Sequence, residues 1–135
     1  MTCNRIALLA ASLVLGGTVG NAMQATTTRS VNDGVYTADQ ATRGEQIFKN
    51  NCSSCHYQTE FSGDDFVKRW ADKPLFELFE LIADSMPEDR PGTLPAQQYG
   101  DTISYFLKLN KFPAGAAELE GSAEAMRDIL MEKLK

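Results

Sequence analysis

The sequence predicts an all-α fold with one domain. A chain of 135 residues is long enough for one hydrophobic core and little more. Several segments carry apolar residues at every third or fourth position, which is the spacing of an amphipathic helix. No segment shows the alternation of period two that predicts a half-buried strand, and the chain contains no internal repeat. Helices, joined by loops rich in proline and glycine, should therefore build the core.

Residues 1–22 have the layout of a secretory signal peptide. The chain starts with a short positive segment, residues 6–19 are apolar or small, and small residues lead to a cleavage site after Ala22, or less suitably after Ala25. A retained membrane anchor is the alternative. The apolar run is shorter than the ~18–20 residues that cross a bilayer, so we expect no stable membrane span. The mature protein is therefore predicted to be exported to the periplasm.

The first predicted helix begins at Thr37, after a small, polar and flexible N-terminal segment over 23–36. Thr37 and Gln40 have the spacing of a capping box, and the apolar pattern that follows runs to Cys52. Proline residues mark the limits of later helices. The further helices are predicted over 66–70, 74–86, 95–110 and 122–135.

The most specific motif is Cys52-Ser53-Ser54-Cys55-His56. Cys-x-x-Cys-His is the attachment signature for covalent haem. Two thiols at this separation reach the two vinyl groups on one side of a porphyrin, and the adjacent histidine is then placed under the iron. The motif therefore predicts one haem c, bonded to Cys52 and Cys55, with His56 as the proximal iron ligand.

Three other interpretations of the cysteine pair are weaker. A thioredoxin-like dithiol would need strands around the motif. A zinc site would need about four ligands, whereas the chain has one histidine and, once Cys3 leaves with the leader, two cysteines. An inert pair would leave the position of the sole histidine unexplained.

The second axial ligand is predicted to be Met86. A bis-histidine haem is excluded because His56 is the only histidine. Met23 borders the cleavage site, and Met126 and Met131 lie in the tail, where methionine usually serves packing. Met86 ends a helix and precedes Pro87, so its backbone is restrained. The alternative is that Met86 is a core residue and the iron is five-coordinate.

The acidic composition argues against nucleic acid as a partner. Asp and Glu number 18 against 13 Lys and Arg, and no basic cluster is visible. Arg69 and Trp70 are candidate donors to a haem propionate; alternatively, Trp70 is core and Arg69 is solvated.

From 37 to 113 the chain resembles a class I cytochrome c. The resemblance rests on Gly44 and Phe48 in the first helix, on the haem motif, on Met86-Pro87, and on the later helix that contains Tyr99 and Tyr105. It implies a domain of helices wrapped around one haem, in which the first and last core helices cross closely. Residues 114–135 would then form an additional helical tail.

This resemblance implies a one-electron carrier that is not an enzyme, with redox proteins as donor and acceptor. Residues 81–94 and 110–115 are similar to bacterial cytochromes that accompany periplasmic dehydrogenases, including quinoprotein dehydrogenases, and a terminal oxidase is another candidate partner. Two alternatives remain: a subunit of a dehydrogenase complex, and a haem enzyme with an open distal site. The family commonly has a proline whose carbonyl orients the proximal histidine. Residues 57–73 contain none, so the acceptor for His56 stays unassigned.

Overall fold

The computed structural model describes residues 28–134, and these form the predicted helical fold. The main helices are α1 (Ala38–Asn51), α2 (Asp64–Trp70), α3 (Leu75–Ser85) and α4 (Ala96–Leu109), with a short α5 (Ala123–Met126). Two 3-10 turns, η1 (Val31–Asp33) and η2 (Gln58–Phe61), and two short strands, β1 (Arg29–Ser30) and β2 (Ile129–Leu130), complete the elements. The predicted signal peptide, Cys3 and Met23 lie outside the described residues.

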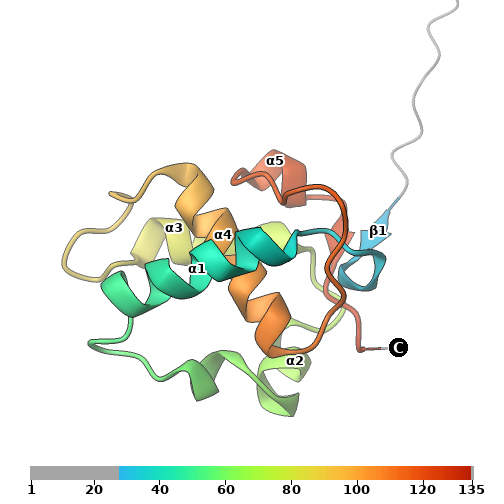
Figure 1. The fold of residues 1–135 in the computed structure, drawn as a ribbon, viewed down its shortest axis with the longest axis horizontal. Helices are drawn as coiled ribbons and strands as arrows, with labels where there is room; N and C mark the ends of the chain where they lie inside the picture. Colours follow the sequence, from blue (N-terminus) through green and yellow to red (C-terminus); the bar gives the residue numbers. More distant parts are fainter. Residues whose placement is uncertain (1–27, 135) are drawn as a thin grey trace, which may run out of the picture.

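Helices α1 and α4 form the centre of the fold and cross each other in Figure 1. Gly44 allows the close approach, because a Cβ there would overlap the carbonyl group of Asp101. One turn later, Phe48 packs against Tyr105 and Phe106, with ring centroids 5.7 and 6.0 Å apart. The close crossing that the family resemblance implied is confirmed.

The start of α1 is only partly as predicted. Thr37 is the N-cap, and its hydroxyl accepts a hydrogen bond of 3.1 Å from the backbone N–H of Gln40. The side chain of Gln40 does not complete a capping box. It is fully buried and instead binds Asp101 Oδ1 at 3.0 Å and both the N–H and the carbonyl group of Leu119. A residue expected to cap a helix thus ties α1 to α4 and to the tail.

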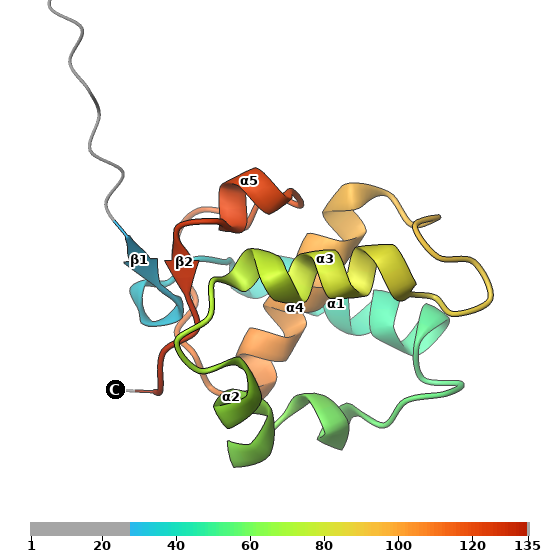
Figure 2. The same cartoon turned by 180° about the vertical axis from the view of Figure 1, so that it is seen from behind.

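The predicted tail helix over 122–135 is wrong for most of its length. Helix α5 ends at Met126, and the chain then becomes extended, with β2 pairing parallel to β1 (Figure 2). The residue after β2, Met131, exchanges backbone hydrogen bonds of 2.9 Å with Asp72 and Lys73. Ile129 and Met131, two positions apart, are both buried, and this spacing is the side-chain period of a strand. These backbone hydrogen bonds replace the ones that a longer helix would have formed.

The prediction of a flexible segment over 23–36 is also wrong from residue 28 onward. Val31, Val35 and Tyr36 are almost completely buried, and the Tyr36 hydroxyl donates a hydrogen bond of 2.7 Å to the carbonyl oxygen of Phe112. Burial raises the pKa of Tyr36 above its ordinary value. This segment therefore belongs to the core.

Among residues 28–134, no helix combines the length and the apolar character that a membrane crossing requires.

Candidate cofactor site

The two cysteines and the histidine of the haem motif directly follow the end of α1. Cys52 caps the helix, and its N–H donates to the carbonyl oxygen of Phe48 at 2.9 Å. The chain then turns tightly, because the N–H groups of Cys55 and His56 both donate to the carbonyl oxygen of Cys52, at 3.1 and 3.0 Å. The turn fixes the three functional residues relative to one another by backbone bonds alone.

Met86 is positioned by the end of α3. It is the C-cap of that helix, and its N–H donates to the carbonyl oxygen of Ile82 at 2.9 Å. Its own carbonyl oxygen accepts a 2.9 Å hydrogen bond from the hydroxyl of Tyr99, on α4. The backbone of Met86 is therefore held from two helices, while its side chain is only half-buried.

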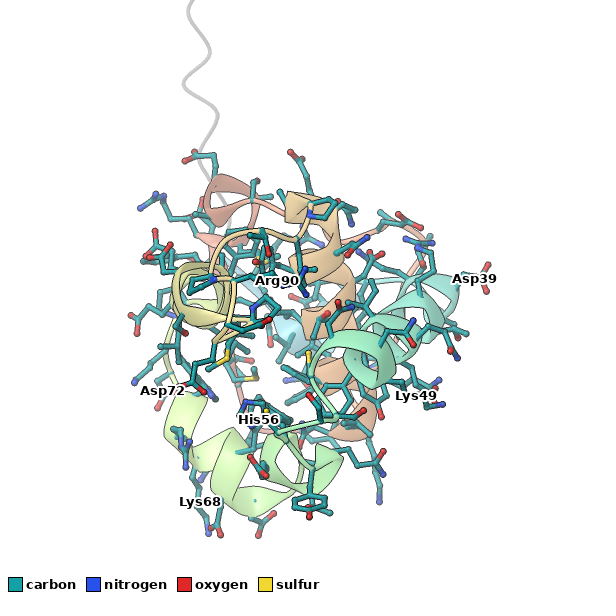
Figure 3. All side chains as sticks on the ribbon, turned by 90° about the vertical axis from the view of Figure 1, so that its left-hand side faces the viewer. Asp39, Lys49, His56, Lys68, Asp72 and Arg90 are labelled. Atoms are coloured by element: carbon teal, nitrogen blue, oxygen red, sulfur yellow. The ribbon has the colours of Figure 1, made fainter. Side chains whose placement is uncertain are left out.

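These four side chains line one cavity of about 690 Å³. That volume is in the range of sites for cofactors and other small molecules. Figure 3 looks toward the opening, with His56 and Arg90 on opposite sides of it. Large apolar residues make up much of the remaining wall: Phe48, Phe61, Phe66, Trp70, Leu78, Ile82 and Phe106. The structure thus brings together all four site residues predicted from the sequence.

No disulfide joins Cys52 to Cys55, and the two side chains have different surroundings. Cys52 is partly buried, and burial raises the pKa of its thiol. Cys55 is exposed. Because no disulfide joins them, both sulfur atoms remain available for thioether bonds.

His56 has a hydrogen-bond partner that the sequence did not suggest. Its Nδ1 lies 3.1 Å from Oε2 of Glu60, and the other carboxylate oxygen accepts a 3.0 Å bond from the backbone N–H of Tyr57. The Tyr57 N–H and the His56 ring hold the pKa of Glu60 below its usual range. The available signal was an acidic residue four positions after the sole histidine, a spacing at which side chains meet on a helical turn.

Of the other residues considered from the sequence, some lie in the core away from the cavity and others line it. Met126 and Met131 are buried in the core and do not line the cavity, which agrees with a packing role. Arg69 and Trp70 both line it. Trp70 is buried and also lines the cavity, so it can belong to the core and still contact a bound group. Arg69 is exposed.

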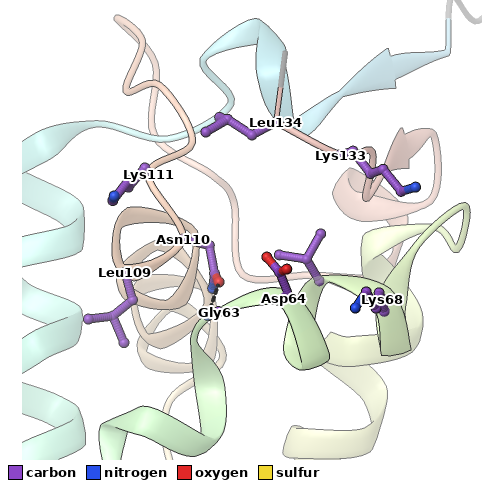
Figure 4. A pocket seen from close by; sticks show the side chains of 9 residues that line it. Gly63, Asp64, Lys68, Leu109, Asn110, Lys111, Lys133 and Leu134 are labelled. Carbon is purple, nitrogen blue, oxygen red and sulfur yellow. Dashed lines mark hydrogen bonds between the residues drawn. The ribbon is translucent and has the colours of Figure 1, made fainter.

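A second cavity of about 480 Å³ shares no lining residue with the first. Figure 4 shows Lys68, Lys111 and Lys133 around it, with Asn110 accepting a 2.9 Å hydrogen bond from the N–H of Gly63. None of the predicted site residues reaches this cavity. Within residues 28–134, no group of three or more His, Cys, Asp or Glu side chains could hold a metal ion without a cofactor.

Comparison with known proteins agrees with this site. Residues 39–106, half of the chain, match the family model described as cytochrome c oxidase, cbb3-type, subunit III. The chain belongs to this family of c-type cytochromes. The matched residues include the haem motif and Met86. No curated protein and no solved structure matches the chain.

Membership in this c-type cytochrome family implies a covalently bound haem c with its iron, and a role in haem-based electron transfer. The residues present fit that group. Two cysteine side chains outside any disulfide, one imidazole and one thioether share the cavity, and its aromatic and aliphatic wall suits a large apolar ligand. The prediction of an all-α cytochrome c with covalent haem is confirmed.

Proposed function

We propose that this cytochrome is a periplasmic one-electron carrier whose single haem is attached to Cys52 and Cys55, with the iron held between His56 and Met86. Such a protein makes and breaks no bond in a substrate. Its polypeptide sets the reduction potential, shields the iron and presents the cofactor to a partner.

The observation that carries this proposal is the position of Met86. The haem motif ends α1 and Met86 ends α3, yet both line the same cavity. Met126 and Met131, the other methionines in the described part of the chain, lie elsewhere in the core. Met86 is therefore the sulfur ligand that the surroundings of the cavity favour.

Bound haem supplies an iron that alternates between the ferric and ferrous states. A thioether ligand favours the ferrous state and raises the potential. If His56 and Met86 fill both axial positions, no position stays open for oxygen or peroxide. This supports a carrier over a haem enzyme with an open distal site.

The rest of the cavity suits the same role. Its apolar wall excludes water from the iron, while exposed lining residues such as Cys55 and Leu81 mark the side that faces solvent. A redox partner would approach on that side.

The predicted leader supports a periplasmic location, and the family description names an oxidase. We therefore propose redox proteins as donor and acceptor, with a terminal oxidase or a periplasmic dehydrogenase as the candidate classes. Size-exclusion chromatography after native purification separates a free carrier, which elutes alone, from a subunit of a dehydrogenase complex.

The test is a reduced-minus-oxidised visible spectrum with a redox titration, on the wild type and on Met86→Ala. The variant should keep its haem, lose the absorbance band near the red end of the visible spectrum that reports iron–sulfur bonding, and show a lower potential. An unchanged potential would remove Met86 from the ligand set. The matched control is Met126→Ala, which deletes a buried methionine that does not line the cavity and should keep both band and potential.

A further inference from the structure

The carboxylate of Glu60 binds two groups at once. Oε1 accepts the N–H of Tyr57 at 3.0 Å, and Oε2 lies 3.1 Å from Nδ1 of His56. Glu60 belongs to η2, the 3-10 turn that follows the haem motif, so the acceptor for His56 comes from the turn directly after it. The carboxylate is held in place by the backbone rather than by a flexible contact.

The bond to Nδ1 fixes which nitrogen of His56 can face a metal. An ionised carboxylate can only accept a hydrogen bond, so Nδ1 carries a proton, and in the neutral imidazole Nε2 then presents its lone pair. Phe61 restrains the ring further, with ring centroids 5.4 Å apart and an interplanar angle of 75°. Among the described residues, Glu60 is the one group that forms a hydrogen bond with the His56 ring.

We propose that Glu60 is the positioning residue of His56 and that its charge lowers the reduction potential of the bound haem. The inference rests on the proposed function, because it requires His56 to be the proximal ligand. A carboxylate that accepts the Nδ1 proton makes the imidazole a more basic ligand than a neutral acceptor would. A more basic ligand stabilises ferric iron, and Glu60 therefore opposes the effect of the Met86 thioether.

A purely structural role for Glu60 is the competing explanation, because its carboxylate accepts the N–H of Tyr57, the residue that begins η2. Glu60→Gln separates the two roles. Glutamine has nearly the same shape, but it has no charge and has one acceptor oxygen for two donors. A cap can be retained by this variant, whereas a charge-assisted bond to His56 cannot.

The decisive experiment compares Glu60→Gln with Glu88→Gln in the holoprotein. Glu88 also lines the cavity and is exposed, but the hydrogen bond of the His56 ring goes to Glu60 and not to Glu88, so the Glu88 variant measures the effect of removing one charge from the rim. Glu60→Gln should raise the reduction potential by up to about 59 mV. For one electron this is about a tenfold change in the ferric–ferrous equilibrium constant. Glu88→Gln should change it less.

A second readout reports the histidine directly. In a Met86→Ala background, the iron–histidine stretching frequency of the ferrous protein should fall with Glu60→Gln and stay constant with Glu88→Gln. A frequency unchanged by Glu60→Gln overturns the inference, whatever the potential does. Colourless protein, or a wild-type mass equal to that of the polypeptide alone, overturns the proposed function instead, so the two failures are distinguishable.

Discussion

The hydroxyl of Tyr99 donates a 2.9 Å hydrogen bond to the carbonyl oxygen of Met86. The same hydroxyl accepts a bond of 3.3 Å from the N–H of Leu94. One side chain of α4 thus holds both ends of the loop that follows α3. Because the ring of Tyr99 also packs edge-on against Phe79, with centroids 6.3 Å apart, the contact fixes Met86 relative to two helices.

Tyr99→Phe should therefore loosen Met86 without emptying the site. Phenylalanine keeps the contact with Phe79 but loses both hydrogen bonds, each of which contributes about 0.5–1.5 kcal/mol. We expect the red absorbance band of the ferric protein to disappear at a lower denaturant concentration than in the wild type, and cyanide to bind faster. Both are measured by visible spectroscopy.

The matched control for Tyr99→Phe is Tyr105→Phe. Tyr105 is on the same helix, and its hydroxyl donates to Oε1 of Gln58 at 3.0 Å, away from Met86. Equal cyanide-binding rates in the two variants would show that the bond from Tyr99 does not restrain the ligand loop.

Gly44→Ala should destabilise the protein more than any exposed alanine substitution on α1. The added Cβ would overlap the backbone carbonyl of Asp101, and a helix backbone cannot move aside as a flexible side chain can. Inserting a methyl group into such a contact costs about 1–3 kcal/mol. Urea denaturation of the holoprotein measures this loss. Gln46→Ala, at an exposed position two residues later, should change the free energy of unfolding by less than about 0.5 kcal/mol.

The parts of the structure that could be predicted from sequence depend on local signals. Thr37 begins α1 because its hydroxyl caps the helix, and Met86 ends α3 where Pro87 prevents its continuation. The haem motif is contiguous, so its spacing alone specified the chemistry. That the distant Met86 lies at the same cavity could be predicted because few methionines were available and one of them preceded a proline.

The parts that could not be predicted depend on contacts between distant segments. The apolar pattern of residues 129–131 is also compatible with a helix. The extended form is stabilised by backbone partners at 29–30 and 72–73. Val31, Val35 and Tyr36 stand in a polar segment too short to show a period. The contact between Glu60 and His56 was not predicted because it depends on how the turn after the motif folds.

Gln40→Met should expose the cost of breaking the buried contact between α1 and the tail. Methionine fills a similar volume but cannot bond to the N–H of Leu119, for which Gln40 Oε1 is the acceptor at 2.8 Å. A buried donor without a partner costs about 1–3 kcal/mol. Asp101 keeps its contacts with Arg43 and Gln97, so the fold should survive.

Urea denaturation of the haem-loaded protein measures the effect of Gln40→Met. Gln46→Met makes the same chemical change at an exposed position of the same helix and should have almost no effect. A similar stability of the two variants would mean that the bonds of Gln40 contribute nothing beyond its packing.

Ile129→Ala tests whether the tail is the strand seen in the structure. Ile129 is almost completely buried and, as part of β2, pairs with Arg29, whereas Leu134 is half exposed. Removing a buried isoleucine side chain costs about 2–5 kcal/mol, while an exposed leucine contributes little. We expect Ile129→Ala to lower the free energy of unfolding by that amount and Leu134→Ala to leave it nearly unchanged. The visible spectrum should stay as in the wild type in both, because neither residue lines the haem cavity. Equal losses in the two variants would contradict the pairing of β2 with β1.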